Sequence, residues 1–190
     1  MESLPLGRTE WIRFYGMLFG KEALADSIFR QTEKSYLDLK QLPRPNMPRP
    51  TVISEKKFSA SWFMPAGDSI SPICMPMPEP IMFSRNSPEP EVRLWLSETV
   101  LDRAIHADMW LIKYNQSEDM TYGDLRAEYA PYENFDAFKN RRIYSCNTGL
   151  VPYYEEFPLH PDYLLKDLIW VFHPELLPGY SPRYYRKMQD

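Results

Sequence analysis

Two ionisable side chains have a spacing that could support catalysis. Asp102 and His106 lie four residues apart in a segment with helical periodicity, so the carboxylate could orient the imidazole as a general base. The sequence places no serine or cysteine nucleophile beside them. An exposed pair on a helix surface is the commoner meaning of this spacing. A small enzyme or ligand-binding domain that uses Asp102 and His106 is therefore kept as an alternative hypothesis.

Residues that could bind a metal ion or a cofactor form no recognised pattern. The two cysteines, Cys74 and Cys146, belong to no CxxC pair, and the three histidines do not stand at zinc-ligand spacing with them. The acidic residues between positions 118 and 133 lack the alternating ligands and central glycine of a calcium loop. With only 7 glycines, a phosphate-binding loop is poorly supported. We predict no catalytic residue, no metal, no cofactor and no enzymatic activity.

The overall charge and the distribution of apolar residues exclude several classes of protein. A formal net charge of −4 disfavours a nucleic-acid-binding protein, which normally carries a basic stripe. The sequence contains no apolar run long enough for a transmembrane helix. Its first residues have neither the apolar core of a signal peptide nor the acid-poor character of a transit peptide, because Glu2 and Glu10 come early. We therefore expect no membrane-spanning segment and no visible leader.

The most distinctive segment is rich in both proline and apolar residues. Residues 43–90 hold 11 of the 19 prolines, and each proline fixes its own φ and disfavours a helical conformation in the residue before it. The apolar content is too high for a disordered linker. An extended apolar tract suits a chain that runs across another protein, and aromatic residues are common in interface cores. We predict these partner-binding residues: Phe58, Trp62, Phe63, Ile73, Met75, Met82, Phe83, Tyr129, Tyr132 and Tyr153.

Hydrophobic periodicity and turn residues predict the elements that would position these side chains. A helix is expected from Thr9, as its N-cap, to about residue 40, with a break or a bend near Gly16 and Gly20. A second helix is expected from Ser97 to about Tyr114, and a last one from Pro161 to about residue 172. Short strands are expected at 57–63, 91–96 and 142–146, the last ending in a turn at 147–149.

These elements predict a mainly α chain with long extended, Pro-rich irregular segments and a few short strands, not a compact classical fold. The expected divisions are an N-terminal helical segment at 1–42, the extended Pro-rich apolar tract at 43–90, and a small α-rich region with a Tyr/Pro-rich tail at 91–190. Irregular segments of this length are uncommon in self-sufficient domains. We take them as an indication that the chain is built onto partners.

Two Tyr/Pro tracts, at 129–132 and 152–154, carry a resemblance to known proteins. In composition they resemble accessory subunits of mitochondrial respiratory complexes, which drape over neighbouring subunits. The resemblance implies a non-catalytic accessory subunit of a mitochondrial membrane complex (respiratory chain or ATP synthase) that stabilises several protein subunits by wrapping, peripheral to the membrane. The implied localisation is mitochondrial, and otherwise cytoplasmic. A structural protein of a virion or phage tail is a second alternative with the same features.

Overall fold

The computed structural model describes residues 5–43, 46–48, 50–59, 61–64 and 93–190, with the backbone alone at 63–64 and 93–98. These residues form two compact units. In the described part, unit 1 contains residues 5–43, 46–47 and 152–183, and unit 2 contains residues 48, 50–59, 61–64, 93–151 and 184–190. Both units are therefore assembled from segments that lie far apart in the sequence.

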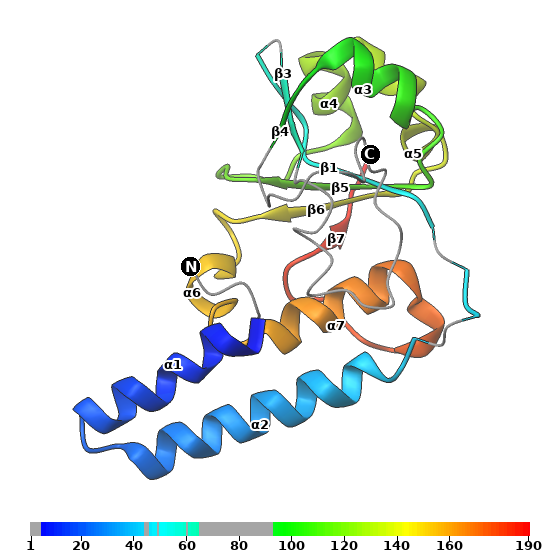
Figure 1. Cartoon of the computed structure of the whole chain (residues 1–190). Coiled ribbons are helices and arrows are strands. Elements are labelled where there is room, and N and C mark those ends of the chain that lie inside the picture. The colour runs from blue at the N-terminus through cyan, green and yellow to red at the C-terminus, as the bar shows by residue number, and fades with distance from the viewer. Residues whose placement is uncertain (1–4, 44–45, 49, 60, 65–92) are drawn as a thin grey trace. The chain divides into compact units, whose positions relative to one another are not determined.

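Unit 1 is helical. Its elements are α1 (Pro5–Leu18), α2 (Glu22–Lys40), α6 (Tyr153–Glu156), α7 (Pro161–Phe172) and the short 3₁₀ helix η2 (Pro174–Leu176). In Figure 1, α1 and α2 lie side by side as a hairpin and α7 runs along α2, in agreement with the contacts among these three helices. Gly20, at φ +62°, makes the turn between α1 and α2 because glycine adopts this left-handed conformation without a steric penalty.

The helix predicted from Thr9 to about residue 40 is present as these two helices, but it begins earlier than expected. Pro5 occupies the first turn, where its missing N–H costs nothing. Thr9 is therefore inside α1 and is not an N-cap. It is fully buried, and its hydroxyl lies 3.4 Å from the carbonyl oxygen of Pro5 and 3.3 Å from that of Pro158.

Unit 2 is built around a mixed sheet of four strands in the order β1-β5-β6-β7. The strands are β1 (Val52–Ser54), β5 (Met109–Tyr114), β6 (Ile143–Asn147) and β7 (Arg186–Lys187). β1, β5 and β6 are parallel, and β7 is antiparallel to β6. A second, antiparallel sheet joins β2 (Lys57–Phe58), β3 (Ser61–Met64) and β4 (Arg93–Leu96) in that order.

Helices connect the parallel strands, as parallel pairing requires. They are α3 (Ser97–Ala104), α4 (Tyr122–Glu128), the 3₁₀ helix η1 (Ala130–Asn134) and α5 (Asp136–Lys139). In Figure 1, α3, α4 and α5 lie on one side of β1 and β5. The core beneath them is aromatic. The rings of Trp62, Tyr132 and Phe135 are all fully buried, and their centroids lie 4.9–5.8 Å from that of Trp110.

The predicted fold class is wrong, and β5 is the main reason. The helix expected from Ser97 to Tyr114 ends at Ala104, and Met109–Tyr114 is instead the central strand of the sheet. Met109 and Ile112 fit helical spacing with the residues before them, but five of the six residues of β5 are buried. A strand buried on both faces is a continuous apolar run, which periodicity cannot distinguish from a buried helix.

Candidate functional site

The carboxyl ends of three parallel strands meet at one edge of the sheet in unit 2. β1 ends at Ser54, β5 at Tyr114 and β6 at Asn147. The ends of β5 and β6 are paired, Tyr114 with Asn147, whereas β1 ends beside Leu111, three residues before the end of β5. In open α/β sheets ligands bind outside the carboxyl ends of the strands. We therefore take this edge, with the loops that follow the three strands, as the candidate binding site.

Asn147 organises the loops after β5 and β6. Its side chain is almost fully buried and its Oδ1 accepts the backbone N–H groups of Gln116 and Gly149, each at 3.1 Å. Its Nδ2 donates to the carbonyl oxygen of Glu118 at 2.9 Å and approaches Asp119 Oδ1 at 3.4 Å. One amide therefore ties two loops together, and a buried polar group of this kind is stable because its hydrogen bonds are satisfied.

A close backbone approach accompanies these hydrogen bonds. A Cβ at Gly149 would lie 2.5 Å from the carbonyl oxygen of Gln116, so only glycine fits there without movement of the loops. The neighbouring Thr148 is held as well, because its N–H and its hydroxyl both donate to the carbonyl oxygen of Tyr114, at 2.8 and 3.1 Å. The predicted turn at 147–149 is therefore confirmed, and its contacts with the loop after β5 show why it is ordered.

The side chains at this edge combine charge with hydrogen-bonding groups. Glu55, directly after β1, forms an ion pair with Lys113 of β5 at 3.4 Å, and both side chains are about one-third exposed or less. Glu55 has φ +61°, and its carbonyl oxygen accepts the indole N–H of Trp110. Gln116 and Leu150 on the following loops are exposed. The edge can thus offer a carboxylate, an ammonium group, an amide and an apolar surface to a small solute.

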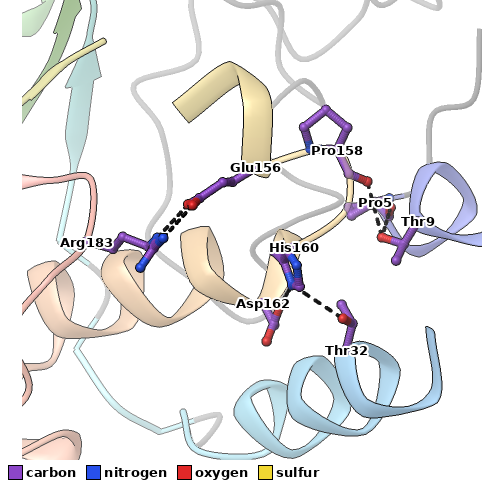
Figure 2. Close-up of polar contacts among 8 residues, drawn as sticks. All are labelled: Pro5, Thr9, Thr32, Glu156, Pro158, His160, Asp162 and Arg183. Carbon is purple, nitrogen blue, oxygen red and sulfur yellow. Dashed lines mark hydrogen bonds and ion pairs between the residues drawn. The ribbon is translucent and has the colours of Figure 1, made fainter. Parts of the chain in front are cut away.

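A second polar cluster lies within unit 1, where α1, α2 and the start of α7 come together (Figure 2). The imidazole of His160 stacks on the Tyr163 ring, with centroids 4.5 Å apart, and its Nδ1 lies 3.5 Å from the hydroxyl of Thr32 on α2. Asp162 is buried, and within the described residues no hydrogen-bond donor reaches its Oδ1. His160 Nδ1 lies 3.8 Å from this oxygen.

Figure 2 also shows Arg183 bound to Glu156 of α6 through two guanidinium nitrogens. The backbone N–H of Arg183 and the hydroxyl of Tyr180 both donate to Asp167 Oδ1, at 2.9 and 2.7 Å. Burial raises the pKa of Tyr180, and the hydrogen bond to Asp167 adds to this effect. These contacts tie the segment after α7 to α6 and α7, which is a structural role.

The two residues proposed for catalysis are not arranged as the alternative hypothesis requires. The side chain of His106 is 84% exposed and its Nδ1 lies 2.9 Å from Asp136 Oδ2, not from Asp102. That contact lowers the pKa of Asp136. Asp102 therefore does not orient this imidazole as a general base, and His106 is an ordinary surface residue.

The predicted partner-binding residues have several different environments. Trp62 and Tyr132 are fully buried in the core of unit 2 and Tyr153 is buried in unit 1, whereas Phe58 is 71% exposed. Tyr129 packs against the core of unit 2. Phe63 lies in β3, and only its backbone is described. Ile73, Met75, Met82 and Phe83 lie outside the described residues, as does most of the predicted extended tract.

Sequence reasoning identified the turn at 147–149 but missed Glu55, Lys113 and the role of Asn147. They were missed because residues 109–114 were predicted to be helical. Only a parallel strand at 109–114 brings Glu55, Lys113 and Asn147 to one edge of the sheet. Among the described residues, no group of three or more His, Cys, Asp or Glu side chains could hold a metal ion. No helix in the same part of the chain is long and apolar enough to cross a membrane.

Comparison with known proteins identifies one relative in sequence. The chain is 25% identical to the uncharacterized lipoprotein MJ0878 of Methanocaldococcus jannaschii over 197 residues, which cover 98% of the chain and 44% of the lipoprotein. No protein-family model matches the chain.

Several solved structures share the fold. They include the TroA-like periplasmic binding protein FepB of Veillonella parvula (TM-score 0.67, 18% identity, 96% of this chain and 61% of that one). An ABC transporter substrate-binding protein of Listeria monocytogenes has a TM-score of 0.60 at 15% identity, covering 87% of this chain and 63% of that one. An ABC-type Fe³⁺-hydroxamate transport protein of Saccharomonospora viridis has 0.58 at 14% identity, covering 87% and 55%. At these identities the likeness establishes the fold.

These findings correct the predictions made from composition. The prediction of a mitochondrial accessory subunit that wraps several partners is wrong, and so is the mitochondrial localisation, because the relative is a prokaryotic lipoprotein and the structural neighbours are periplasmic or transporter-associated binding proteins. The neighbours have an α/β fold with a mixed parallel sheet, which also overturns the mainly α class. The names of these neighbours describe binding and transport proteins, and the prediction of a non-enzymatic chain stays a prediction.

Proposed function

We propose that this protein binds a small solute outside the cytoplasm and presents it to the membrane subunits of an ABC transporter. The observation that carries this proposal is the fold match to a TroA-like periplasmic binding protein over 96% of the chain. Because one fold can serve many functions, a site is needed as well. The carboxyl edge of β1, β5 and β6 supplies one at the position where ligands bind in open α/β sheets.

In this proposal the partner of the chain is an ABC transporter, and the chain is located at the outer side of a prokaryotic cell membrane. The lipoprotein relative supports an extracytoplasmic location, and the names of two structural neighbours refer to ABC transporters. The chain spans less than two-thirds of each of these proteins. The complete activity of such a protein is therefore part of the proposal.

Ferric hydroxamate is the first solute class to test, because one neighbour's name specifies it. Purified protein would be titrated with a ferric hydroxamate complex, the iron-free hydroxamate and an inorganic Fe³⁺ salt, with tryptophan fluorescence as the readout. Trp110 contacts the candidate edge through Glu55, so occupation of the edge should change the fluorescence. We expect saturable binding of one of these solutes. No saturable signal with these or with a wider panel of organic solutes would contradict the proposal.

A pair of matched variants tests the position of the site. Lys113→Ala removes the ammonium group at the edge, and we expect it to weaken binding of a responsive solute about tenfold, which corresponds to about 1.4 kcal/mol. His106→Ala, on the exposed surface, should leave the affinity unchanged. An equal affinity for wild type and Lys113→Ala would move the solute site away from this edge.

A further inference from the structure

The loop after β5 contains a motif that solute binding leaves unexplained. Asn115-Gln116-Ser117 matches the N-glycosylation sequon, in which a hydroxyl residue stands two positions after an asparagine and the residue between them is not proline. It is the only such triplet in the chain. A sequon is used only on a surface loop of a protein that leaves the cytoplasm, so its meaning depends on where the chain folds and on what the structure does with these three residues.

The structure presents the motif in a form that can accept a glycan. Asn115, Gln116 and Ser117 follow the end of β5 in a loop without helix or strand, and all three residues are exposed. Among the described residues, none forms a hydrogen bond with the Asn115 amide or with the Ser117 hydroxyl. The acceptor nitrogen and the hydroxyl that defines the sequon are therefore both accessible to a glycosyltransferase.

The backbone of the motif is held while its side chains stay outside. The N–H of Gln116 donates to Oδ1 of the buried Asn147 at 3.1 Å. Asn115 Oδ1 would lie 3.3 Å from a Cβ built at Gly149, so the Asn115 side chain lies beside the turn at 147–149. A glycan attached to Asn115 would thus extend into solvent from the rim of the candidate edge, without displacing a buried group.

The other asparagines in the described part of the chain provide a contrast. Asn147 is almost fully buried, which leaves no room for a sugar on its amide, and glycine stands two positions after it. Asn46, Asn134 and Asn140 are exposed, but no hydroxyl residue stands two positions after any of them. Exposure and sequon therefore coincide at Asn115 alone among the described asparagines.

We propose that Asn115 is an N-glycosylation site. The reaction is a group transfer from an oligosaccharide linked to a lipid phosphate or diphosphate. Nδ2 of Asn115 forms a bond to the anomeric carbon of the first sugar, and the bond from that carbon to the phosphate oxygen breaks. The lipid phosphate leaves with the bonding electrons, and Nδ2 gives up one proton. This inference rests on the proposed function, because the transfer takes place outside the cytoplasm.

Mass spectrometry of the protein purified from its source cells tests the proposal. Cleavage after Lys113 and Arg126 releases peptide 114–126, in which Asn115 is the only asparagine. We expect part or all of this peptide to carry an oligosaccharide, and electron-transfer fragmentation to locate it on Asn115. An isotope-labelled unmodified peptide measures the remainder. Recovery of the whole peptide without sugar, or sugar on Ser117 or Thr121 in place of Asn115, would overturn the proposal.

Three variants identify the sequon as the cause of the modification. Asn115→Gln and Ser117→Ala should each abolish the sugar-bearing peptide, whereas Ser117→Thr should keep it, because threonine supplies the same hydroxyl. Peptide 127–139, which contains the exposed Asn134 outside any sequon, should stay unmodified in every sample. Sugar that persists on Asn115 in Ser117→Ala would contradict transfer directed by the sequon.

Solute titration of the same preparations separates this inference from the proposed function. A glycan on Asn115 in a protein that binds none of the solutes would contradict only the proposed solute binding. Saturable solute binding by a protein whose Asn115 carries no sugar would contradict only the glycosylation site.

Discussion

Asn147 shows how much of the candidate site depends on one side chain. All the polar atoms of its amide are used, and the groups it binds belong to the two loops that would contact a solute. The neighbouring Gly149 permits the close backbone approach that these bonds need. The exposed side chains at the edge are thus held by a buried one.

Asn147→Ala should therefore destabilise unit 2 and weaken solute binding together. The variant leaves the N–H groups of Gln116 and Gly149 without their acceptor, and the loss of a buried hydrogen-bonding group of this kind costs about 2 kcal/mol. Urea unfolding monitored by fluorescence measures the change. Ser117→Ala, at an exposed position on the same loop, is the control and should be neutral. An Asn147→Ala protein as stable as wild type would show that the loops are held in another way.

Asp26 is the residue whose ionisation should control the α1–α2 hairpin. Hydrogen bonds from Arg13, at 3.0 and 2.7 Å, hold the pKa of the Asp26 carboxyl below its usual value. A lowered folded-state pKa stabilises the fold above the unfolded-state pKa of about 3.9, and this contribution is lost as the pH falls through the folded-state value. We predict lower amide protection factors in α1, that is, exchange rates closer to the intrinsic rate at the same pH, as the pH is lowered from 5 toward the folded-state pKa of Asp26.

The matched variants for this pH dependence are Asp26→Asn and Glu10→Gln. Asp26→Asn should remove most of the change in the α1 protection factors between pH 5 and lower pH, because it has no carboxylate to protonate. Glu10 also faces Arg13 but at 3.4 Å with a side chain that is 62% exposed, and exposed pairs contribute little. Glu10→Gln should keep the wild-type profile. The reverse result would assign the pH dependence to Glu10.

At the level of elements, the contact between α1 and α2 decides between two opposite expectations for Gly16. Alanine in place of glycine normally stabilises a helix by about 1 kcal/mol. Here the added Cβ would lie 2.4 Å from the Ala25 methyl group, a separation that forces the helices apart. Because a displaced helix loses packing along its length, the steric effect should exceed the gain in helix propensity.

Gly16→Ala is therefore expected to lower the midpoint of thermal unfolding of the hairpin, and Gly16→Ala with Ala25→Gly to restore most of the loss. The double variant exchanges the positions of the methyl group and the hydrogen at the contact, so the separation of the helices is recovered. Calorimetry with helix-specific amide exchange gives the comparison. A stabilised single variant would mean that the helices separate without cost.

At the level of the whole molecule, the described chain consists of a helical unit and an α/β unit, each assembled from distant segments. β5 is the element that defines the second unit, because it pairs with β1 on one side and β6 on the other. Its side chains are buried among the aromatic residues of the core. Local stability in a protein follows burial and hydrogen bonding.

We predict that the amides of β5 exchange more slowly than those of any other strand of this sheet. The two residues of β7 at the sheet edge should exchange orders of magnitude faster, since an edge strand has a partner on one side only. Amide exchange of the purified protein followed by NMR gives residue-level rates. Fast exchange throughout 109–114, equal to that of β7, would contradict the central position of this strand.

The sequence by itself determined the elements whose signals are local. The hairpin helices with their break at Gly20, the last helix beginning at Pro161, the β6 strand and the turn at 147–149 were all predicted, because periodicity, glycine and proline act within a few residues. Tertiary structure alone decided that 109–114 is a strand, since an apolar run becomes a central strand only when partners such as 52–54 and 143–147 pair with it.

The candidate site depends on the same distant pairing. Glu55 and Lys113 are 58 positions apart in the sequence, and only the parallel register of β1 and β5 brings them within 3.4 Å. Aromatic residues make up 15% of the sequence. Composition could not separate those buried in the core, such as Trp62 and Tyr132, from those exposed on the hairpin, such as Trp11 and Phe14. Burial is a property of the assembled fold, because a side chain is covered by residues that are remote in the sequence.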